Sequence, residues 1–156
     1  MKNNQFLDNV LNNLLNPHEE LFITGFRDID NTIVGIPKGT LITVGGRPAM
    51  GKTTFLMSIL EMALKNNKKC LYFSFAISEE IFIRRILIQM AELNSIIIRL
   101  GNISDIEKEK LSQSMKDLKN CDFELSCEIS SVEDIEEKIS FYKPDYVFID
   151  YIQLIK

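Results

Sequence analysis

Residues 46–53 read Gly46-Arg47-Pro48-Ala49-Met50-Gly51-Lys52-Thr53 and match the pattern G-x-x-x-x-G-K-[ST] in full. In this pattern the glycines let backbone N–H groups turn toward an anion, the lysine supplies a positive charge for the β- and γ-phosphates, and the hydroxyl can ligate Mg²⁺. The flanks agree, because residues 41–45 predict a buried strand and residues 51–66 predict a helix whose N-terminus faces the phosphate. The pattern therefore favours a nucleotide phosphate site over a glycine turn that binds nothing.

The rest of the chain alternates between predicted strands and helices. We expect strands at 70–75, 122–126 and 146–149, and helices at 78–93, 104–119 and 131–141, the last capped by Ser130 or Ser131. Residues 17–40 are turn-rich and are expected to be irregular. Strands that alternate with helices indicate βαβ units, so the predicted fold class is α/β, with a mostly parallel sheet flanked by helices.

Near the N-terminus, residues 3–15 predict an amphipathic helix, which Asn16-Pro17 ends. Apolar side chains recur on one face at helical spacing, and asparagines fill the other. The apolar residues are Phe6, Leu7, Val10, Leu11, Leu14 and Leu15. Such a face either folds back on the chain's own core or docks on a partner, and the sequence leaves both open.

The composition is that of a globular domain, with 156 residues of which 46% are hydrophobic and 26% charged. The formal net charge of −4 provides no overall basic field of the kind that indicates nucleic-acid binding. No apolar run approaches the length of a membrane span, and the N-terminus lacks the basic start of a signal peptide. We therefore expect a cytoplasmic protein with no membrane partner.

Three cysteines, Cys70, Cys121 and Cys127, and a single histidine, His18, are spaced too widely for a zinc cage. We expect reduced thiols in or near the core and assign no metal to them.

A second motif completes the predicted phosphate site. Tyr146-Val147-Phe148-Ile149-Asp150 places four apolar residues before an acid. Such a strand buries itself and delivers the Asp150 carboxylate at its C-terminal edge, where it can hold a Mg²⁺ water beside Thr53. Many buried strands end in aspartate, but about 100 residues after a phosphate loop the pattern becomes specific.

The residues around both motifs resemble those of one family. The run Asp150-Tyr151-Ile152-Gln153-Leu154 resembles the D-Y-L-Q-L signature of the DnaB-type replicative helicases, which are RecA-like hexameric ATPases. The phosphate loop, extended to Thr54, is similar to that family's A-R-P-S-M-G-K-T form. Three further segments match family positions: Thr24-Gly25-Phe26-Arg27-Asp28-Ile29-Asp30, Phe73-Ser74-Phe75 with Arg85, and Arg99-x-Gly101.

This resemblance implies a RecA-like P-loop NTPase core over residues 22–156, preceded by a linker helix and loop at 1–21. It implies that residues 46–54 bind ATP or ADP, that Lys52 and Thr53 bind phosphate and Mg²⁺, and that Asp150 positions Mg²⁺. Gln153 would sense the γ-phosphate or relay the nucleotide state. Family members turn over ATP in a six-membered ring, translocate on single-stranded DNA and unwind duplex. Ring assembly or self-association would use the N-terminal helix and the RecA-like face.

One departure from the family falls on the catalytic machinery. The family's F-S-L strand is followed by a glutamate that activates the attacking water, and here the residue is Ala76. A methyl group accepts no proton, and losing a positioned general base typically costs roughly 10²- to 10⁴-fold in rate. Glu79 or Glu80 could substitute, although acids in a first helical turn ordinarily stabilise the helix dipole. We expect impaired hydrolysis with binding retained, and the sequence does not separate a native Ala76 from an engineered one.

A second departure concerns residues that the family places after the position of Lys156. There the family carries further strands, DNA-binding loops and an arginine that reaches the neighbour's γ-phosphate. We therefore expect an incomplete sheet and weak DNA binding by this chain alone. The leading function is the ATP-binding core of a DnaB-type helicase. The alternative is a non-catalytic nucleotide-binding paralogue that binds or regulates a replicative helicase or its loader. A small-molecule kinase fits less well, because Arg84 and Arg85 lie on an apolar helix rather than on a lid.

Overall fold

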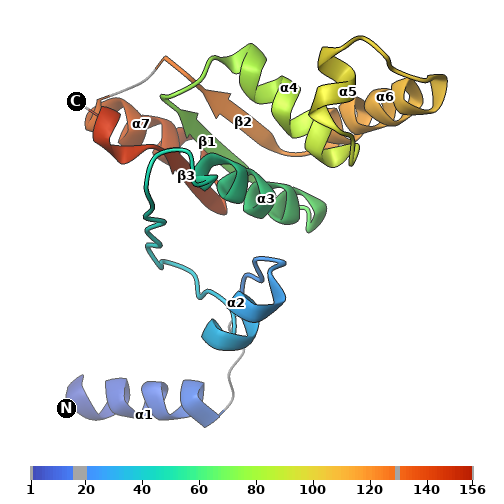
Figure 1. Ribbon diagram of the computed structural model, residues 1–156. Helices are drawn as coiled ribbons and strands as arrows, with labels where there is room; N and C mark the ends of the chain where they lie inside the picture. The colour runs from blue at the N-terminus through green and yellow to red at the C-terminus, as the bar shows by residue number, and fades with distance from the viewer. Residues whose placement is uncertain (1, 16–20, 129–130, 156) are drawn as a thin grey trace. The chain divides into compact units, whose positions relative to one another are not determined.

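Figure 1 shows the computed structural model, which describes residues 2–15, 21–128 and 131–155. Its elements, in chain order, are α1 (Lys2–Leu15), α2 (Arg27–Ile33), α3 (Lys52–Lys65), β1 (Cys70–Ser74), α4 (Glu79–Met90), α5 (Ser95–Arg99), α6 (Asp105–Asn120), β2 (Phe123–Ser126), α7 (Val132–Tyr142), β3 (Tyr146–Asp150) and the 3₁₀ turn η1 (Ile152–Leu154). The contacts divide the chain into two compact units, Met1–Thr43 and Val44–Lys156. The expectations for Asn16-Pro17, His18 and Ser130 fall outside the described residues.

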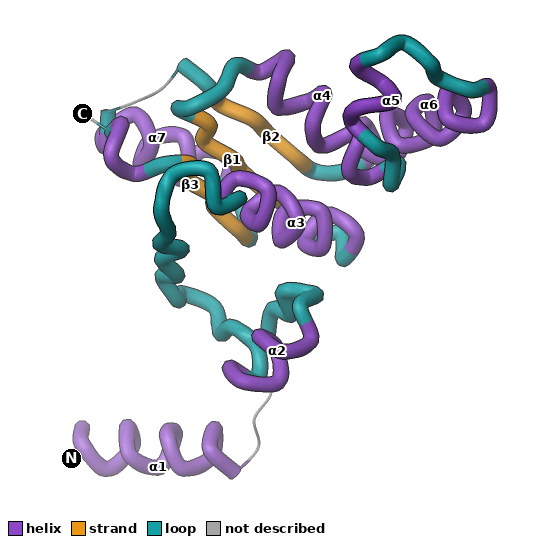
Figure 2. The backbone as a smooth tube through the Cα atoms, viewed as in Figure 1, coloured by secondary structure: helices purple, strands orange, loops and turns teal. Residues whose placement is uncertain are grey.

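The larger unit is built on a parallel sheet, which in the described residues has three strands in the order β2-β1-β3. Helices flank this sheet on both faces (Figures 1 and 2), with α3 and α4 on one face and α7 on the other. The predicted α/β class is therefore confirmed. The strands predicted at 70–75, 122–126 and 146–149 form within one residue of their expected ends.

Side-chain alternation gives the central strand two different faces. On the face toward α3 and α4, Tyr72 is fully buried, and its ring centroid lies 4.5 Å from that of Phe82 and 5.7 Å from that of Phe148. The other face holds an apolar cluster under α7, formed by Leu71, Phe73 and Ile135. Because β1 is covered on both sides, its sequence is apolar almost throughout, as is usual for an inner strand of a parallel sheet.

Hydrogen bonds at both ends of β3 fix its register against β1. Before the strand, Lys69 N donates to Asp145 Oδ2 at 2.9 Å, and Asp145 N donates to the Lys69 carbonyl oxygen at 2.8 Å. After it, Phe75 N donates to the Asp150 carbonyl oxygen at 2.8 Å. The resulting alignment places Ser74 opposite Asp150.

The predicted helices of the larger unit are confirmed, with local details that explain their ends. α6 begins with a capping box, in which Glu107 N donates to Ser104 Oγ and Ser104 N donates to Glu107 Oε2. Ser131 caps α7 by accepting a hydrogen bond from Asp134 N at 3.2 Å. α4 ends at Met90, three residues before the predicted end at 93. The short helix α5 was not predicted, and Asn94 Oδ1 caps it by accepting from Ile96 N.

The prediction of a strand at 41–45 is wrong. These residues belong to no helix or strand in the structure, and the Leu41 side chain is 91% exposed. A strand needs a neighbour that accepts and donates its backbone hydrogen bonds. The sheet formed by the described residues offers no strand alongside 41–45, so the apolar run alone does not produce one.

The smaller unit contains α1 and α2. The helix predicted at 3–15 is confirmed by α1, whereas the expectation that 17–40 is wholly irregular is wrong at α2. The Asp30 carboxylate accepts hydrogen bonds from Thr24 N, Thr24 Oγ1 and Gly25 N, at 2.8, 2.7 and 3.0 Å, and so ties the entry turn to the helix. These bonds hold the pKa of Asp30 below its usual value, against the opposing effect of its burial. The predicted boundary after residue 21 stays a prediction.

The three cysteines are free in the structure, with Cys70 buried and Cys121 and Cys127 half-buried. None of the described helices has the length and apolar character needed to cross a membrane.

Candidate nucleotide-phosphate site

The phosphate loop ends at the first turn of α3 and contains two residues with left-handed backbone conformations. Ala49 and Gly51 have φ angles of 62° and 85°, in the left-handed region. Gly51 is the N-cap of α3 and provides no side-chain hydrogen bond to the first turn. The N–H groups at the start of this 14-residue helix are therefore not capped by a side chain. Such a helix start attracts an anion through its N–H groups and the helix dipole.

Lys52 lies over the loop. Its Nζ donates to the carbonyl oxygens of Gly46 and Arg47, both at 3.1 Å. Neutral carbonyls are weaker partners for an ammonium group than an anionic oxygen. A phosphate that entered the loop would therefore compete successfully for Nζ, which the loop already holds near the helix start.

Asp150 is the last residue of β3 and is only 3% exposed. Its Oδ2 accepts a hydrogen bond from the hydroxyl of Tyr72 at 3.1 Å. Burial raises the pKa of Tyr72, and the nearby Asp150 charge raises it further. Tyr72 therefore remains protonated at neutral pH and donates the hydrogen bond.

The topology brings the loop and Asp150 to the same edge of the sheet. Only residues 66–69 join α3 to β1, so the C-terminus of α3 lies at the amino ends of the strands and its N-terminus at their carboxyl ends (Figure 1). Asp150 ends β3 at that edge. It shares a sheet face with Phe148, which stacks on Tyr72, and α3 and α4 cover this face.

The donor set at this edge fits a nucleotide with Mg²⁺. The Thr53 hydroxyl and the Asp150 carboxylate are hard oxygen ligands of the kind that Mg²⁺ prefers. Lys52 and the start of α3 provide positive charge for phosphate oxygens. The chemistry of the residues therefore agrees with the sequence prediction for this edge.

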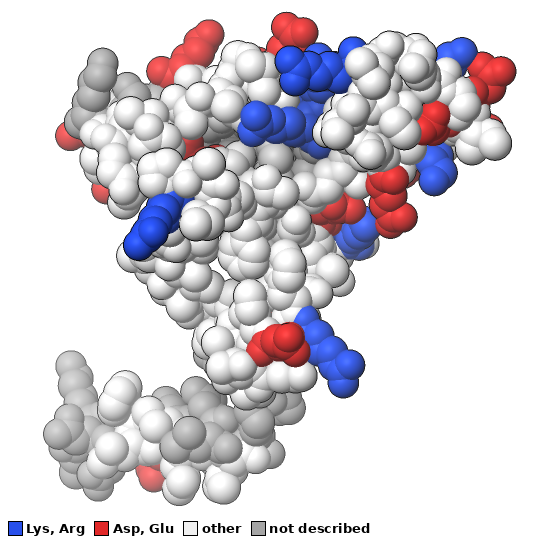
Figure 3. Space-filling view, viewed as in Figure 1, with Lys and Arg blue, Asp and Glu red and all other residues white. Residues whose placement is uncertain are grey.

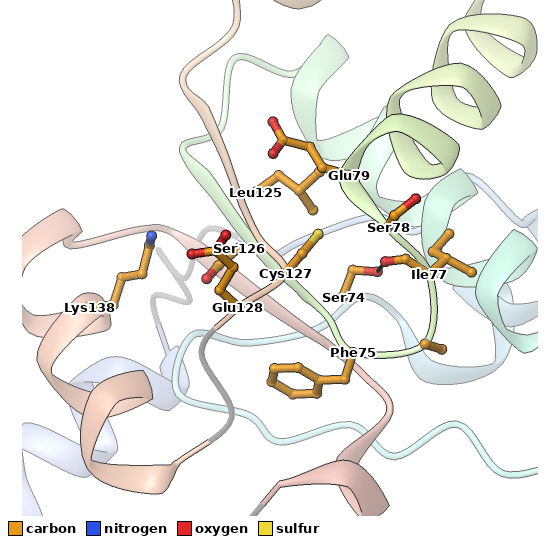
Figure 4. Close-up of a pocket in the computed structure, with 11 residues that line it drawn as sticks. Ser74, Phe75, Ile77, Ser78, Glu79, Leu125, Ser126, Cys127, Glu128 and Lys138 are labelled. Atoms are coloured by element: carbon orange, nitrogen blue, oxygen red, sulfur yellow. Dashed lines mark hydrogen bonds between the residues drawn. The ribbon is translucent and has the colours of Figure 1, made fainter.

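Two further residues from the sequence analysis lie at the same edge. Gln153 is exposed on η1, directly after β3. Ala76 is exposed in the bend after β1, where it lines an open cleft between the ends of β1 and β2 (Figure 4). Within this bend the Ser74 hydroxyl donates to the Ile77 carbonyl oxygen at 3.0 Å. In Figure 4 the Glu79 carboxylate points away from Ser74 and Phe75.

Sequence reasoning missed Tyr72. It appeared there only as part of an apolar strand, although it is the one residue of Cys70–Ser74 that joins a large ring to a hydroxyl. Its partner lies 78 residues away in the sequence, so only the pairing of β1 with β3 could have indicated the contact.

Together, the parallel sheet, the phosphate-loop sequence at the start of α3 and the acid at the end of β3 define an α/β domain of the RecA-like P-loop type. The chain belongs to the family of DnaB-like helicase C-terminal domains, because the model of that family matches residues 22–156. The resemblance stated from the motifs is thus confirmed.

Curated relatives agree with this assignment. A probable replicative DNA helicase from Guillardia theta is 34% identical over 86% of this chain and 24% of its own length. The replicative DNA helicase DnaB of Geobacillus stearothermophilus is 31% identical over 85% of this chain and 31% of its own length. The chain therefore spans only about a quarter to a third of these relatives.

Solved structures show the same fold. One of them, described as an ATPase domain, has a TM-score of 0.85 at 21% identity, covering 98% of this chain and 58% of that one. A DnaB-like replicative helicase, described with its interactions with primase, has a TM-score of 0.84 at 21% identity, covering 97% of this chain and 39% of that one.

Proposed function

We propose that this chain is the ATP-binding core of a DnaB-type replicative helicase and that it binds ATP or ADP together with Mg²⁺. The observation that carries the proposal is the placement of Lys52, Thr53 and Asp150 at one edge of the sheet, beside a helix start without a side-chain cap.

Each residue has a separate task in this proposal. The loop N–H groups and Lys52 would bind the β- and γ-phosphates, and Thr53 and Asp150 would hold Mg²⁺, Asp150 through a bound water. Bound Mg²⁺ neutralises phosphate charge. Gln153 follows Asp150 closely and would respond to the γ-phosphate. With Ala76 at the position of the family's glutamate, no side chain of the bend after β1 takes a proton from the attacking water, so hydrolysis is slow.

Calorimetric titration with Mg-ATP tests the binding proposal. Lys52→Ala should weaken affinity by about tenfold or more, because it removes charge-assisted bonds to phosphate. Lys116→Ala provides a matched control, since it removes an exposed lysine from α6, a helix that packs against α4 rather than at the loop. Equal affinity of the Lys52 variant and the unchanged chain would contradict the proposal, as would the absence of binding by the unchanged chain.

Assembly through α1 is a further part of the proposal. The described apolar side chains of α1 are exposed, with Phe6, Leu7, Leu11 and Leu15 each more than half exposed. Burying such a face against a second copy or another helicase subunit would be favourable. We propose that α1 and the RecA-like face mediate ring assembly or self-association.

We propose only weak binding of single-stranded DNA by this chain alone. On the face shown in Figure 3, Lys and Arg side chains gather in one group in the upper part of the view and elsewhere lie among Asp and Glu, so no basic surface runs across this face. Affinity for single strands depends strongly on such a surface.

The second candidate function is a non-catalytic paralogue that binds or regulates a replicative helicase or its loader. Ala76 is the specific observation that favours this function. The bend after β1 lies at the same edge of the sheet as the phosphate loop and Asp150, but it carries alanine where the family has its general base. Co-purification with an intact helicase, reversed by charge substitutions on α1, would support this function over an enzymatic one.

A further inference from the structure

Tyr72 stands at the centre of the sheet face that carries the phosphate site. Its side chain is fully buried, and Phe82 and Phe148 pack against its ring. The register pairs Tyr72 with Phe148 and Ser74 with Asp150. The Tyr72 hydroxyl therefore reaches diagonally to Asp150 Oδ2, on the neighbouring strand and two residues beyond the partner of Tyr72 in the register.

This hydrogen bond makes the two oxygens of the Asp150 carboxylate unequal. Oδ2 is occupied by the Tyr72 hydroxyl, whereas the described residues give Oδ1 no hydrogen-bond donor. No fully buried side-chain oxygen in the described part of the chain lacks a partner. Oδ1 is therefore not fully buried, and it is the oxygen that keeps contact with solvent at the edge of the sheet.

The tyrosine is held so firmly that it can set the orientation of the carboxylate. A tyrosine side chain has two rotatable torsions, and close packing around the fully buried Tyr72 ring restricts both. A carboxylate at a strand end otherwise rotates about its own χ2 torsion, which is broad. A hydrogen bond from a fixed donor removes much of this freedom.

We propose that Tyr72 is a positioning residue that holds the Asp150 carboxylate so that Oδ1 alone faces the water shell of a nucleotide-bound Mg²⁺. This proposal rests on the proposed function. It predicts a specific defect when the hydroxyl is lost: the benefit of Mg²⁺ to nucleotide binding falls, while binding of the metal-free nucleotide does not.

The experiment measures ATP affinity of the full chain by calorimetry, at a series of Mg²⁺ concentrations and in EDTA. Tyr72→Phe keeps the ring and removes the hydroxyl. We expect the Mg²⁺ concentration for half-maximal enhancement to rise roughly 3- to 10-fold, as for the loss of one hydrogen bond of ordinary strength. Affinity in EDTA should stay unchanged.

Tyr142→Phe is the matched control. The Tyr142 hydroxyl donates to Asp122 Oδ1 at 2.6 Å, and Asp122 precedes β2, at the amino edge of the sheet. This variant therefore loses a hydroxyl–carboxylate bond far along the strands from the phosphate site. Neither its Mg²⁺ dependence nor its affinity in EDTA should differ from the unchanged chain.

Other results would separate the two proposals. If the unchanged chain binds ATP with Mg²⁺ and Tyr72→Phe shows the same Mg²⁺ dependence, Tyr72 has no positioning role although the proposed function stands. An equal loss with Mg²⁺ and in EDTA would also overturn the role, because it indicates general packing damage. No binding of ATP by the unchanged chain would remove the proposed function and this inference together.

A second measurement applies if Tyr72→Phe does not fold. The chain has four tyrosines, so 3-fluorotyrosine labelling gives four fluorine resonances, and Phe variants of Tyr142, Tyr146 and Tyr151 identify the one from Tyr72. Addition of Mg²⁺ to the ATP-bound chain should shift the Tyr72 resonance and leave that of Tyr142 in place. A Tyr72 resonance that does not respond would overturn the inference.

Discussion

Truncation of Phe82 to alanine tests whether the packing over Tyr72 supports the domain. The Phe82 side chain is fully buried on α4, with ring centroids 4.5 Å from Tyr72 and 6.2 Å from Phe123. Truncating a buried phenylalanine costs about 3–5 kcal/mol through lost burial and the cavity left behind. Each aromatic pair adds about 0.5–1.5 kcal/mol beyond burial, so we expect the upper half of that range, about 4–5 kcal/mol.

Urea unfolding followed by far-ultraviolet circular dichroism measures this loss. With a slope of about 2 kcal/mol/M for a domain of this size, the midpoint should fall by about 2 M. Ile81→Ala is the control on the same helix, because the Ile81 side chain is 46% exposed and its truncation should cost no more than about 1 kcal/mol. Equal midpoint shifts for the two variants, or a shift below about 0.5 M for Phe82→Ala, would refute the packing argument.

Two other predictions concern catalysis and pH. Ala76→Glu should raise ATP turnover, measured by phosphate release, by roughly 100-fold or more, because it supplies a general base. Glu79→Gln, made in the otherwise unchanged chain, should not alter turnover. A large loss of turnover in Glu79→Gln would instead identify Glu79 as the base. Burial raises the pKa of Cys70 from 9.0 to about 12, so between these pH values the folded state keeps a proton that the unfolded state loses. The contribution of Cys70 to folding stability is therefore full below pH 9 and falls as the pH rises from 9 toward 12. When thermal unfolding is followed across that range, the fall should be smaller in Cys70→Ala. Identical pH profiles for the two chains would contradict that account.

The parts of the fold that could be predicted are those that local patterns determine. The three strands are short apolar runs between polar turns, and the helix after the phosphate loop follows from a pattern in which each residue type has a backbone or charge role. Asp150 was predicted at a strand end because the acid directly follows an apolar run. The structure places it where that reasoning expected.

The parts that could not be predicted depend on distant partners. Residues 41–45 have the composition of a strand, but a strand forms only beside another, and pairing is not visible in a local run. α2 is short, and its entry turn is held by the Asp30 carboxylate rather than by an apolar period. Tyr72 acquires its importance only when β1 lies beside β3, because its partner is remote in sequence.

The alignment of β3 on β1 has a consequence for insertions and deletions. Side chains alternate between faces, so sliding β3 by one residue would turn Asp150 toward the apolar layer under α7 and would bring Ile149 to the edge that faces α3. The hydrogen bonds from Lys69 to Asp145 and from Phe75 to Asp150 stabilise the observed register against that slip. Inserting or deleting one residue within Tyr146–Asp150 should therefore move the Asp150 carboxylate to the wrong face of the sheet. Inserting or deleting two residues should return it to the face that carries the phosphate site. The effect of insertions and deletions in this strand would then alternate with a period of two residues. Single substitutions do not reveal this dependence on the register.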